Sequence, residues 1–298
     1  MQTQAFIAVT AQPVPYYADT TAIFNTLCQP NSNSLLLDSA EIGSKNSLQS
    51  LILVNAAVKI TCLGHNVTFK ALNENGKQVL KEIHPKLTAL GKVSAVNFKE
   101  EFTVQFSPLD NQLDEDSKLQ SATIFDGLRV VSTLYQHSQT PIFLGGLFAY
   151  DLVTNFIPMD GITLRNDGIN CPDYSFYLAD HLITIDHKNQ QATLKSFCFA
   201  QEEQVNIAKT SLSIAQKLKN IDNVLSIKAA SDEVKTNFDD PEFTGIVKAL
   251  KHHINIGDVF QIVPSRRFSL ACPNTLASYA QLKQNNPSPY MFYMNDED

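Results

Sequence analysis

Hydrophobic and polar positions along the chain form short blocks whose spacing predicts a mixture of strands and helices. Residues 50–54, 58–63 and 66–72 have strand length, and the third run alternates apolar and polar side chains. Similar runs predict strands at 102–106, 174–178, 182–186, 192–199, 259–268 and 290–294. Strands and helices are therefore expected to share one chain.

Apolar residues at helical spacing predict helices in four segments, which are 118–136, 201–219, 240–256 and 276–283. In the first, the apolar positions from Ile124 to Leu134 recur every three or four residues and so share one face. Terminal signals mark the third: Asp240 is expected to cap it, Pro241 suits its first turn, and Gly257 suits its end.

Other segments lack a regular period. Residues 1–34 are polar and are expected to be irregular, and residues 73–76 (NENG) predict a turn. Residues 220–239 are the best linker candidate. The last strand-like run stops at residues 295–298 (NDED), which are turn residues, so we expect the sequence to be cut inside a hairpin.

Composition limits the functional class. The chain has 298 residues, 44% hydrophobic and 18% charged, as in a globular protein, and its net charge of -7 argues against nucleic acid or an anionic membrane as the main partner. Its five cysteines are odd in number and never spaced as C-x-x-C, which favours a reducing compartment over disulfides or zinc. With neither a signal peptide nor an apolar run of membrane-spanning length, a cytoplasmic location is expected.

General catalytic motifs are scarce. The sequence contains no phosphate-binding loop, nucleophile elbow, H-E-x-x-H or G-x-G-x-x-G pattern. Gly145 and Gly146 are best interpreted as a close backbone approach within a sheet. His252 and His253 are adjacent on a predicted helix, so they point apart and make a poor metal pair. His181 and His187 bring no Cys, Asp or Glu cluster with them in sequence.

Two features of the predicted strand 259–268 leave alternatives open. Arg266 and Arg267 are expected to point to opposite sides, and the inward one either makes a structural salt bridge or binds an anionic ligand. Gln261 lies on the same strand, and an inward amide there needs polar partners or a ligand.

Four stretches, in this order and spacing, resemble the large-subunit family of bacterial anthranilate synthases. They are LLLDSAEI at 35–42, GGLFAYDLV at 145–153, GDVFQIVPSRRF at 257–268 and NPSPYMF at 286–292, and CPDY at 171–174 adds a fifth match.

The resemblance implies conversion of chorismate to anthranilate in tryptophan biosynthesis, with Mg²⁺ as cofactor and ammonia from a glutamine amidotransferase partner subunit in a heterotetramer. It also implies an α+β fold with layered β structure and flanking helices. Residues 1–219 would form an N-terminal regulatory domain, 220–239 a linker, and 240–298 the start of a chorismate-binding domain. The family's magnesium ligands and catalytic residues would lie beyond position 298, so this fragment alone is expected to be inactive.

The same resemblance implies a site for L-tryptophan as feedback inhibitor, made by Ser39 and by Pro289, Tyr290 and Met291. Tyr290 and Met291 offer an aromatic face and a polarizable sulfur to an indole ring. Asp38 would support the site, and it stands where many members of the family have Glu. Of the residues present, Gln261 is the candidate for a position near the chorismate ring.

Three rival interpretations stay open. Aminodeoxychorismate synthase and isochorismate synthase share the implied fold, and the first can also hold tryptophan. In a different class, the chain is a tryptophan-binding and subunit-docking module without catalysis. The third interpretation is a fragment without function that exposes its core.

Overall fold

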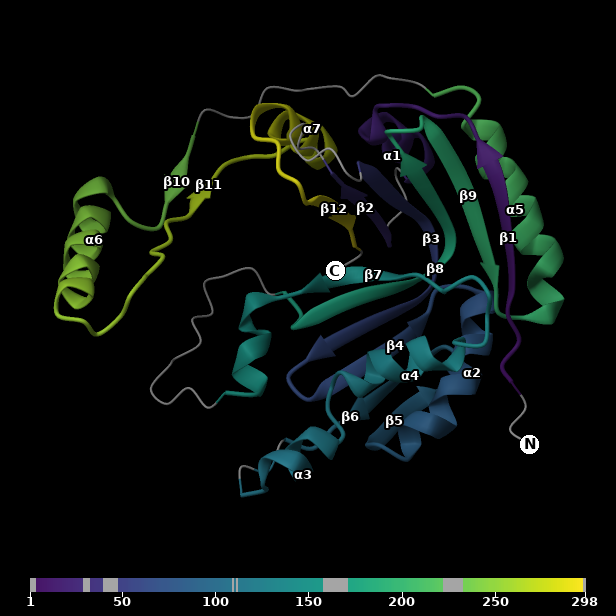
Figure 1. The fold of residues 1–298 in the computed structure, drawn as a ribbon, viewed down its shortest axis with the longest axis horizontal. Helices are drawn as coiled ribbons and strands as arrows, with labels where there is room; N and C mark the ends of the chain where they lie inside the picture. Colours follow the sequence, from purple (N-terminus) through teal and green to yellow (C-terminus); the bar gives the residue numbers. More distant parts are fainter. Residues whose placement is uncertain are drawn as a thin grey trace. The chain divides into compact units, whose positions relative to one another are not determined.

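The computed structural model describes residues 4–28, 33–39, 48–108, 110, 112–157, 171–221 and 233–296 (Figure 1). The chain divides into two compact units, a larger one made of residues 1–224 and 283–298 and a smaller one made of 225–282. Most of the predicted linker, residues 40–47 and the last two residues of the predicted terminal turn lie outside the described residues.

The larger unit combines one antiparallel sheet with helices, so the predicted α+β class is confirmed. Its strands are β1 (Ala8–Val14), β2 (Ser34–Asp38), β3 (Gln49–Leu63), β4 (Asn66–Ala71), β5 (Lys92–Asn97), β6 (Glu101–Gln105), β7 (Leu144–Phe148), β8 (Tyr174–Asp186), β9 (Gln191–Cys198) and β12 (Met291–Asn295). Its helices are α1 (Thr20–Cys28), α2 (Glu74–Thr88), α3 (Glu115–Gln120), α4 (Asp126–Leu134) and α5 (Gln204–Lys217), with 3-10 turns η1 (Tyr150–Asn155) and η2 (Gln201–Glu203).

The sheet forks along its two longest strands. β3 and β8 pair with each other along nearly their whole length. At one end, β2 and then β12 extend the sheet beside β3, while β9 and β1 extend it beside β8. At the other end, β4, β6 and β5 follow β3, and β7 lies beside β8. One pair of strands therefore carries two separate branches.

The fork coincides with an irregularity in the β3–β8 ladder. The pairing register shifts between Leu53 and Val58, where Asn55 pairs with His181 and Ala56 with Ala179. Such a bulge bends the strands and increases their twist. The sequence signal was a break in the apolar pattern at both places, which is why β3 and β8 were each predicted as two shorter strands.

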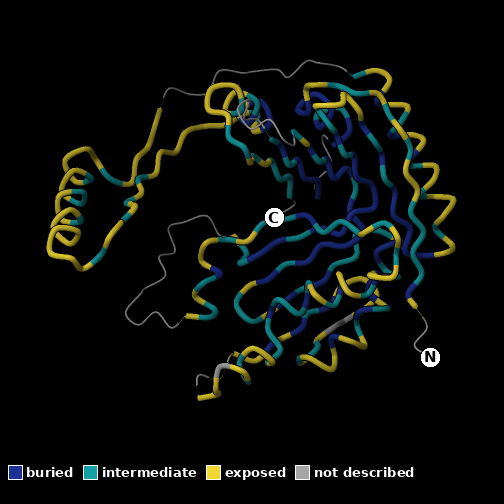
Figure 2. The backbone as a smooth tube through the Cα atoms, viewed as in Figure 1, coloured by how far each residue is buried: buried dark blue, intermediate teal, exposed yellow. Residues whose placement is uncertain are grey.

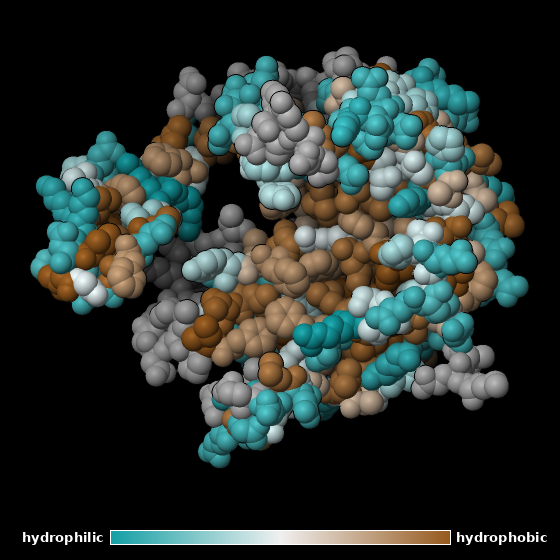
Figure 3. All heavy atoms as spheres, viewed as in Figure 1, coloured by the Kyte–Doolittle hydropathy of each residue, from teal (hydrophilic) through white to brown (hydrophobic). Residues whose placement is uncertain are grey.

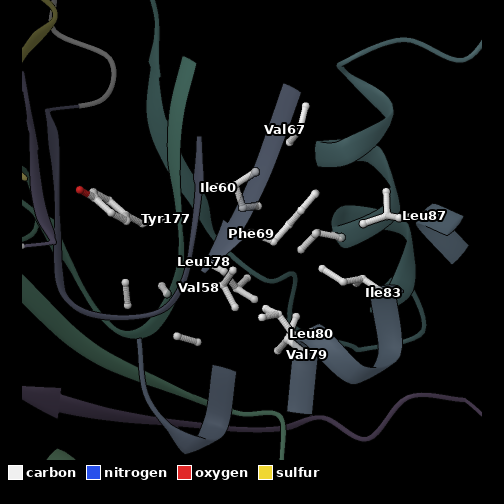
Figure 4. Packing of buried hydrophobic residues seen from close by; sticks show 14 of the residues in the cluster. Val58, Ile60, Val67, Phe69, Val79, Leu80, Ile83, Leu87, Tyr177 and Leu178 are labelled. Carbon is white, nitrogen blue, oxygen red and sulfur yellow. The ribbon is translucent and has the colours of Figure 1, made fainter. Parts of the chain in front are cut away.

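Helix α2 covers one branch of the sheet. Figure 4 shows Val58, Ile60, Val67 and Phe69 of β3 and β4 facing Val79, Leu80, Ile83 and Leu87 of α2. All of these side chains are fully buried, and each contributes about 2 kcal/mol from removal of apolar surface from water. Figure 2 shows the same concentration of burial along the central strands.

Three local predictions in the larger unit were wrong. Residues 73–76 begin α2 and do not form a turn: the Asn73 side chain accepts a hydrogen bond from the Gly76 N–H and caps the helix. The described part of residues 1–34 holds β1 and α1, so the prediction of an irregular segment was wrong there. The predicted helix 118–136 is broken into α3 and α4, since Ser121 is in an extended conformation.

The smaller unit contains α6 (Asp240–Asn255), a two-residue ladder of β10 (Lys235–Thr236) with β11 (Phe268–Ser269), and most of α7 (Thr275–Asn285). Helix α6 confirms the prediction, but its cap is Asp239, which forms a capping box with Glu242, and not Asp240. Gly257 ends it with a φ of 85°. The predicted strand 259–268 was wrong except at its last residue, because no described strand pairs with residues 259–267.

Among the described residues, every helix is too short or too polar to cross a membrane.

Candidate functional site

The pairing of β2 with β12 brings the predicted tryptophan-site residues together from opposite ends of the chain. The ladder aligns Met291 with Asp38 and continues antiparallel to Asn295 opposite Ser34. Ser39 follows β2, and Pro289 and Tyr290 precede β12, so these three residues flank the same end of the ladder. The structure thus brings together Ser39, Pro289, Tyr290 and Met291.

The two faces of this ladder differ in exposure. Residues opposite one another on antiparallel strands project to the same face, so Met291 shares a face with Asp38, whose side chain is fully buried. Tyr290 is 91% exposed, whereas Ser39, Pro289 and Met291 are half-buried. An exposed phenol ring beside a half-buried hydroxyl and thioether offers a contact surface for an aromatic ligand.

Asp38 is held by donors from three other elements. Thr20 Oγ1, at the start of α1, donates to Asp38 Oδ2 at 2.8 Å, and Ser50 Oγ of β3 donates to Oδ1 at 2.5 Å. Lys283 Nζ, near the end of α7, donates to Oδ2 at 2.5 Å and to Thr20 Oγ1 at 2.9 Å. Burial raises the pKa of Asp38, but the Lys283 charge and the hydrogen bonds outweigh it, so the pKa lies below 3.8.

A chain of hydrogen bonds continues from Asp38 toward the surface. Because Ser50 gives its only proton to Asp38, its oxygen accepts from His187 Nε2 at 2.9 Å. That assigns the proton of the neutral ring to Nε2 and leaves Nδ1 to accept from Tyr16 Oη at 3.3 Å. Burial lowers the pKa of His187 below 6.5, although the Asp38 charge opposes this, which favours the neutral ring.

This network defines what Asp38 does. Both of its carboxylate oxygens accept charged or hydroxyl donors from the protein. Asp38 therefore stabilises the end of β2 through these hydrogen bonds, and both of its carboxylate oxygens are already engaged by protein donors. Sequence reasoning missed Thr20, Ser50 and Lys283, and it considered His187 without a link to Asp38. The reason is that these residues come from four distant segments with no shared local pattern.

A second polar region lies at the fork of the sheet. A cavity of about 590 Å³ is lined by Asn55, Asn73, Asp180, His181 and Glu203, among others. Asp180 accepts from Asn73 Nδ2 at 2.5 Å and Asn75 Nδ2 at 2.6 Å. Its burial raises its pKa to about 7. The two adjacent residues Asp180 and His181 both reach this cavity because they lie at the bulge, where the regular alternation of β8 is interrupted.

His181 is neutral in this cavity. Its Nδ1 lies 3.4 Å from Asn55 Nδ2, an N–H donor, and its Nε2 lies 3.3 Å from the Ile207 carbonyl oxygen, an acceptor. These partners assign the proton to Nε2. Burial lowers the pKa of His181 to about 4, against a smaller opposite effect of the bond to Ile207.

A second cavity is mainly apolar. It measures about 770 Å³ and is lined by Leu63, Leu147, Pro172, Phe292 and Met294, with Lys59 paired to Asp296 at its edge. Figure 3 shows hydrophobic residues gathered over this part of the sheet, around β7 and β8. The apolar surface therefore continues from β12 across the branch that carries β7.

The structure confirms the interpretation of Gly145 and Gly146 as a close backbone approach within the sheet. A Cβ added to Gly146 would lie 2.1 Å from the Ser175 carbonyl oxygen on the neighbouring strand β8. Only a residue without a side chain lets β7 approach β8 this closely.

The remaining candidates lie in the smaller unit. Arg266 donates to Asp240 at 2.6 Å and its guanidinium lies 4.8 Å from the Phe268 ring centre, so its salt-bridge interpretation is confirmed. Gln261 is exposed and lies outside any strand. His252 and His253 are exposed on α6, as expected for a solvent-facing pair.

The described residues do not fit a metal centre. They contain no group of three or more His, Cys, Asp or Glu side chains placed to hold an ion.

Comparison with known proteins places these features in a family. The model of the family described as chorismate binding enzyme matches residues 77–298. The chain belongs to the chorismate binding enzyme family. Within it, the chain is 95% identical over 298 residues to anthranilate synthase component 1 of Haemophilus influenzae, covering 100% of this chain and 58% of that protein. It is 46% identical over 294 residues to the Vibrio cholerae protein of that name, covering 95% and 54%.

The chain therefore spans little more than half the length of these curated relatives. Among solved structures, anthranilate synthase component I from Streptococcus pneumoniae aligns with a TM-score of 0.49 at 17% identity, covering 83% of this chain and 48% of that one. Membership of the chorismate binding enzyme family rests on the family model, which covers the α2–β9 region, the smaller unit and β12.

Proposed function

We propose that the protein carrying this chain is the large subunit of an anthranilate synthase, converting chorismate and ammonia to anthranilate and pyruvate. The family match and the names of the relatives support this activity. A glutamine amidotransferase subunit as the ammonia source, Mg²⁺ as cofactor, a heterotetrameric assembly and a cytoplasmic location belong to the same proposal. No described residue is assigned to the chemical steps, and Gln261 stays a candidate for a position near the chorismate ring.

Within that protein, the larger unit carries the site at which L-tryptophan inhibits. The observation that supports it is the β2–β12 pairing, which joins Ser39 to Pro289, Tyr290 and Met291. The Ser39 hydroxyl and the backbone of residues 289–291 serve the polar groups of the amino acid, while Tyr290 and Met291 contact the indole. Inhibition then requires that tryptophan bind one of two states of the protein more tightly than the other.

The test follows anthranilate fluorescence produced from chorismate, magnesium and ammonium by the full-length gene product. Tryptophan is expected to suppress the signal in the unaltered protein. Ser39→Ala is expected to retain activity and to need about tenfold more tryptophan for the same inhibition, because a hydrogen bond to a charged group contributes roughly 1.5–3 kcal/mol. Ser213→Ala, an exposed change on α5, serves as the control.

Two outcomes contradict the proposal separately. If the folded protein consumed chorismate without forming anthranilate, the activity would be that of an aminodeoxychorismate or isochorismate synthase. If Ser39→Ala were inhibited like the unaltered enzyme, the activity would stand and the assignment of the tryptophan site would be wrong.

A further inference from the structure

The connection between α7 and β12 is attached to one residue at both of its ends. Met291, which follows the connection, is paired with Asp38 in the β2–β12 ladder. Lys283, which precedes it, binds the Asp38 carboxylate through its ammonium group. The last turn of α7 and the loop 286–290, which includes Pro289 and Tyr290, are therefore closed on Asp38.

The ion pair that closes this loop is largely removed from water. The Asp38 side chain is 0% exposed and that of Lys283 is 24% exposed. The ammonium also donates to Thr20, whose own hydroxyl donates to Asp38, so three side chains form a closed ring of hydrogen bonds. A buried ion pair is stabilised when each charged group also makes further hydrogen bonds, as both groups do here.

We propose that Lys283 is a positioning residue for the tryptophan site, fixing the loop 286–290 against Ser39 by its bond to Asp38. This inference rests on the proposed tryptophan site. Lys283 acts through Asp38 and touches no ligand itself. Fixing both ends of a short connection that contains two prolines removes most of its conformational freedom before a ligand arrives. A ligand then binds without the entropic cost of ordering the loop.

The test compares Lys283→Met, Lys283→Arg and Lys209→Met in the full-length gene product. Methionine keeps the length and apolar character of the lysine side chain but removes the charge, and arginine keeps the charge. Lys209 is an exposed lysine of α5 in the same unit and controls for the loss of one positive charge. Two readouts are measured: tryptophan affinity by calorimetry, and hydrogen–deuterium exchange of peptides covering residues 286–292.

Lys283→Met is expected to weaken tryptophan binding by about tenfold and to speed exchange in residues 286–292 by about tenfold, the effect of a buried pair reduced for the partial exposure of Lys283. Lys283→Arg should keep most of the tryptophan affinity and most of the protection from exchange, and Lys209→Met should change neither quantity. Recovery by arginine separates positioning by charge from a loss of packing.

The pH dependence gives a readout that packing alone would not alter. Asp38 faces Thr20 from α1, Ser50 from β3, Lys283 from α7 and, through Ser50, His187 after β8. Without the lysine charge, the burial of Asp38 is no longer offset, so Asp38 should take up a proton at a higher pH in Lys283→Met than in the unaltered protein. The pH range over which tryptophan affinity changes should therefore lie higher in Lys283→Met.

The outcomes separate this inference from the proposed function. Unchanged exchange and affinity in Lys283→Met would overturn the positioning role while leaving the tryptophan site intact. If the unaltered protein did not bind tryptophan, the proposed site would fail, and faster exchange in Lys283→Met would still show that Lys283 fixes the loop.

Discussion

Two neighbouring residues of β8 are expected to give opposite pH dependences of stability that nearly cancel. Asp180 has its pKa raised from 3.8 to about 7, and His181 has its pKa lowered from 6.5 to about 4. Burial is the main cause in both cases, and their side chains are 2% and 1% exposed. Each residue therefore contributes to stability through protons bound differently by the folded and unfolded chains.

The sign follows from which state holds the proton. Between pH 3.8 and about 7 the folded state keeps a proton on Asp180 that the unfolded chain loses, so the unfolding free energy falls as pH rises. Between about 4 and 6.5 the unfolded chain binds a proton on His181 that the folded state excludes, so the unfolding free energy rises. At about 1.4 kcal/mol per pKa unit, the two changes are about 4 and about 3 kcal/mol.

Single replacements should reveal each contribution. In Asp180→Asn only the histidine remains, and stability relative to the unaltered chain should rise by about 4 kcal/mol from pH 4 to pH 7. In His181→Gln only the carboxyl group remains, and relative stability should fall by about 3 kcal/mol from pH 4 to pH 6.5. Gln is chosen because its amide can donate to the Ile207 carbonyl oxygen as His181 does.

The assay is urea unfolding followed by circular dichroism at about pH 4, 5, 6, 6.5 and 7 for each variant. Differences from the unaltered chain remove the contribution of all other groups. Slopes of the same sign in the two variants, or slopes equal to that of the unaltered chain, would refute the reasoning. In that case the cavity would be solvated well enough to leave both groups near their ordinary pKa values.

Two further predictions concern backbone packing and a buried amide. Gly146→Ala should push β7 from β8 and destabilise the chain by about 3 kcal/mol in urea unfolding, since the added Cβ meets backbone atoms of Ser175 and Phe176. Gly245→Ala on α6 is the matched control, because its Cβ meets nothing within 4 Å, and it should be neutral or stabilising by up to about 1 kcal/mol. Asn75→Ala should cost about 4 kcal/mol in the same assay, because Asn75 bonds Asp180 and the backbone of Phe197, Phe199 and Ala200. A loss below about 1 kcal/mol would contradict its bridging role.

The sequence pattern predicted strands well where apolar and polar residues alternate clearly, but it indicated no strand at β5, although β5 pairs with the next strand in the chain. β4 and β6 were found because their apolar alternation is uninterrupted. β3 and β8 were each divided because the bulge at the fork places polar side chains inside a long strand. The run at 259–267 shows the reverse error. Its exposure alternates from residue 261 onward, but strand formation needs a neighbouring strand, which a local pattern does not indicate.

Helix starts and turns use the same residues, which explains the error at 73–76. Asn73 and Gly76 suit a turn, yet here the asparagine caps α2. The pattern that indicates helix α2 is the spacing of its buried apolar residues, Val79, Leu80, Ile83 and Leu87. The candidate site shows a different limit. The resemblance named Ser39 and Tyr290, but the ring of Asp38, Thr20 and Lys283 depends on long-range pairing that no local pattern contains.

The pairing of β2 with β12 also has a consequence for biosynthesis on the ribosome. β2 can pair with β3 soon after both are synthesised. The partner of its other edge, β12, is synthesised only from residue 291 onward. At roughly 5–20 residues per second, that delay lasts about 12 to 50 seconds. During this time the nascent chain presents an open strand edge rich in leucine, which favours pairing with other chains. Occupation of this edge by a chaperone during translation is therefore expected to increase the yield of folded protein.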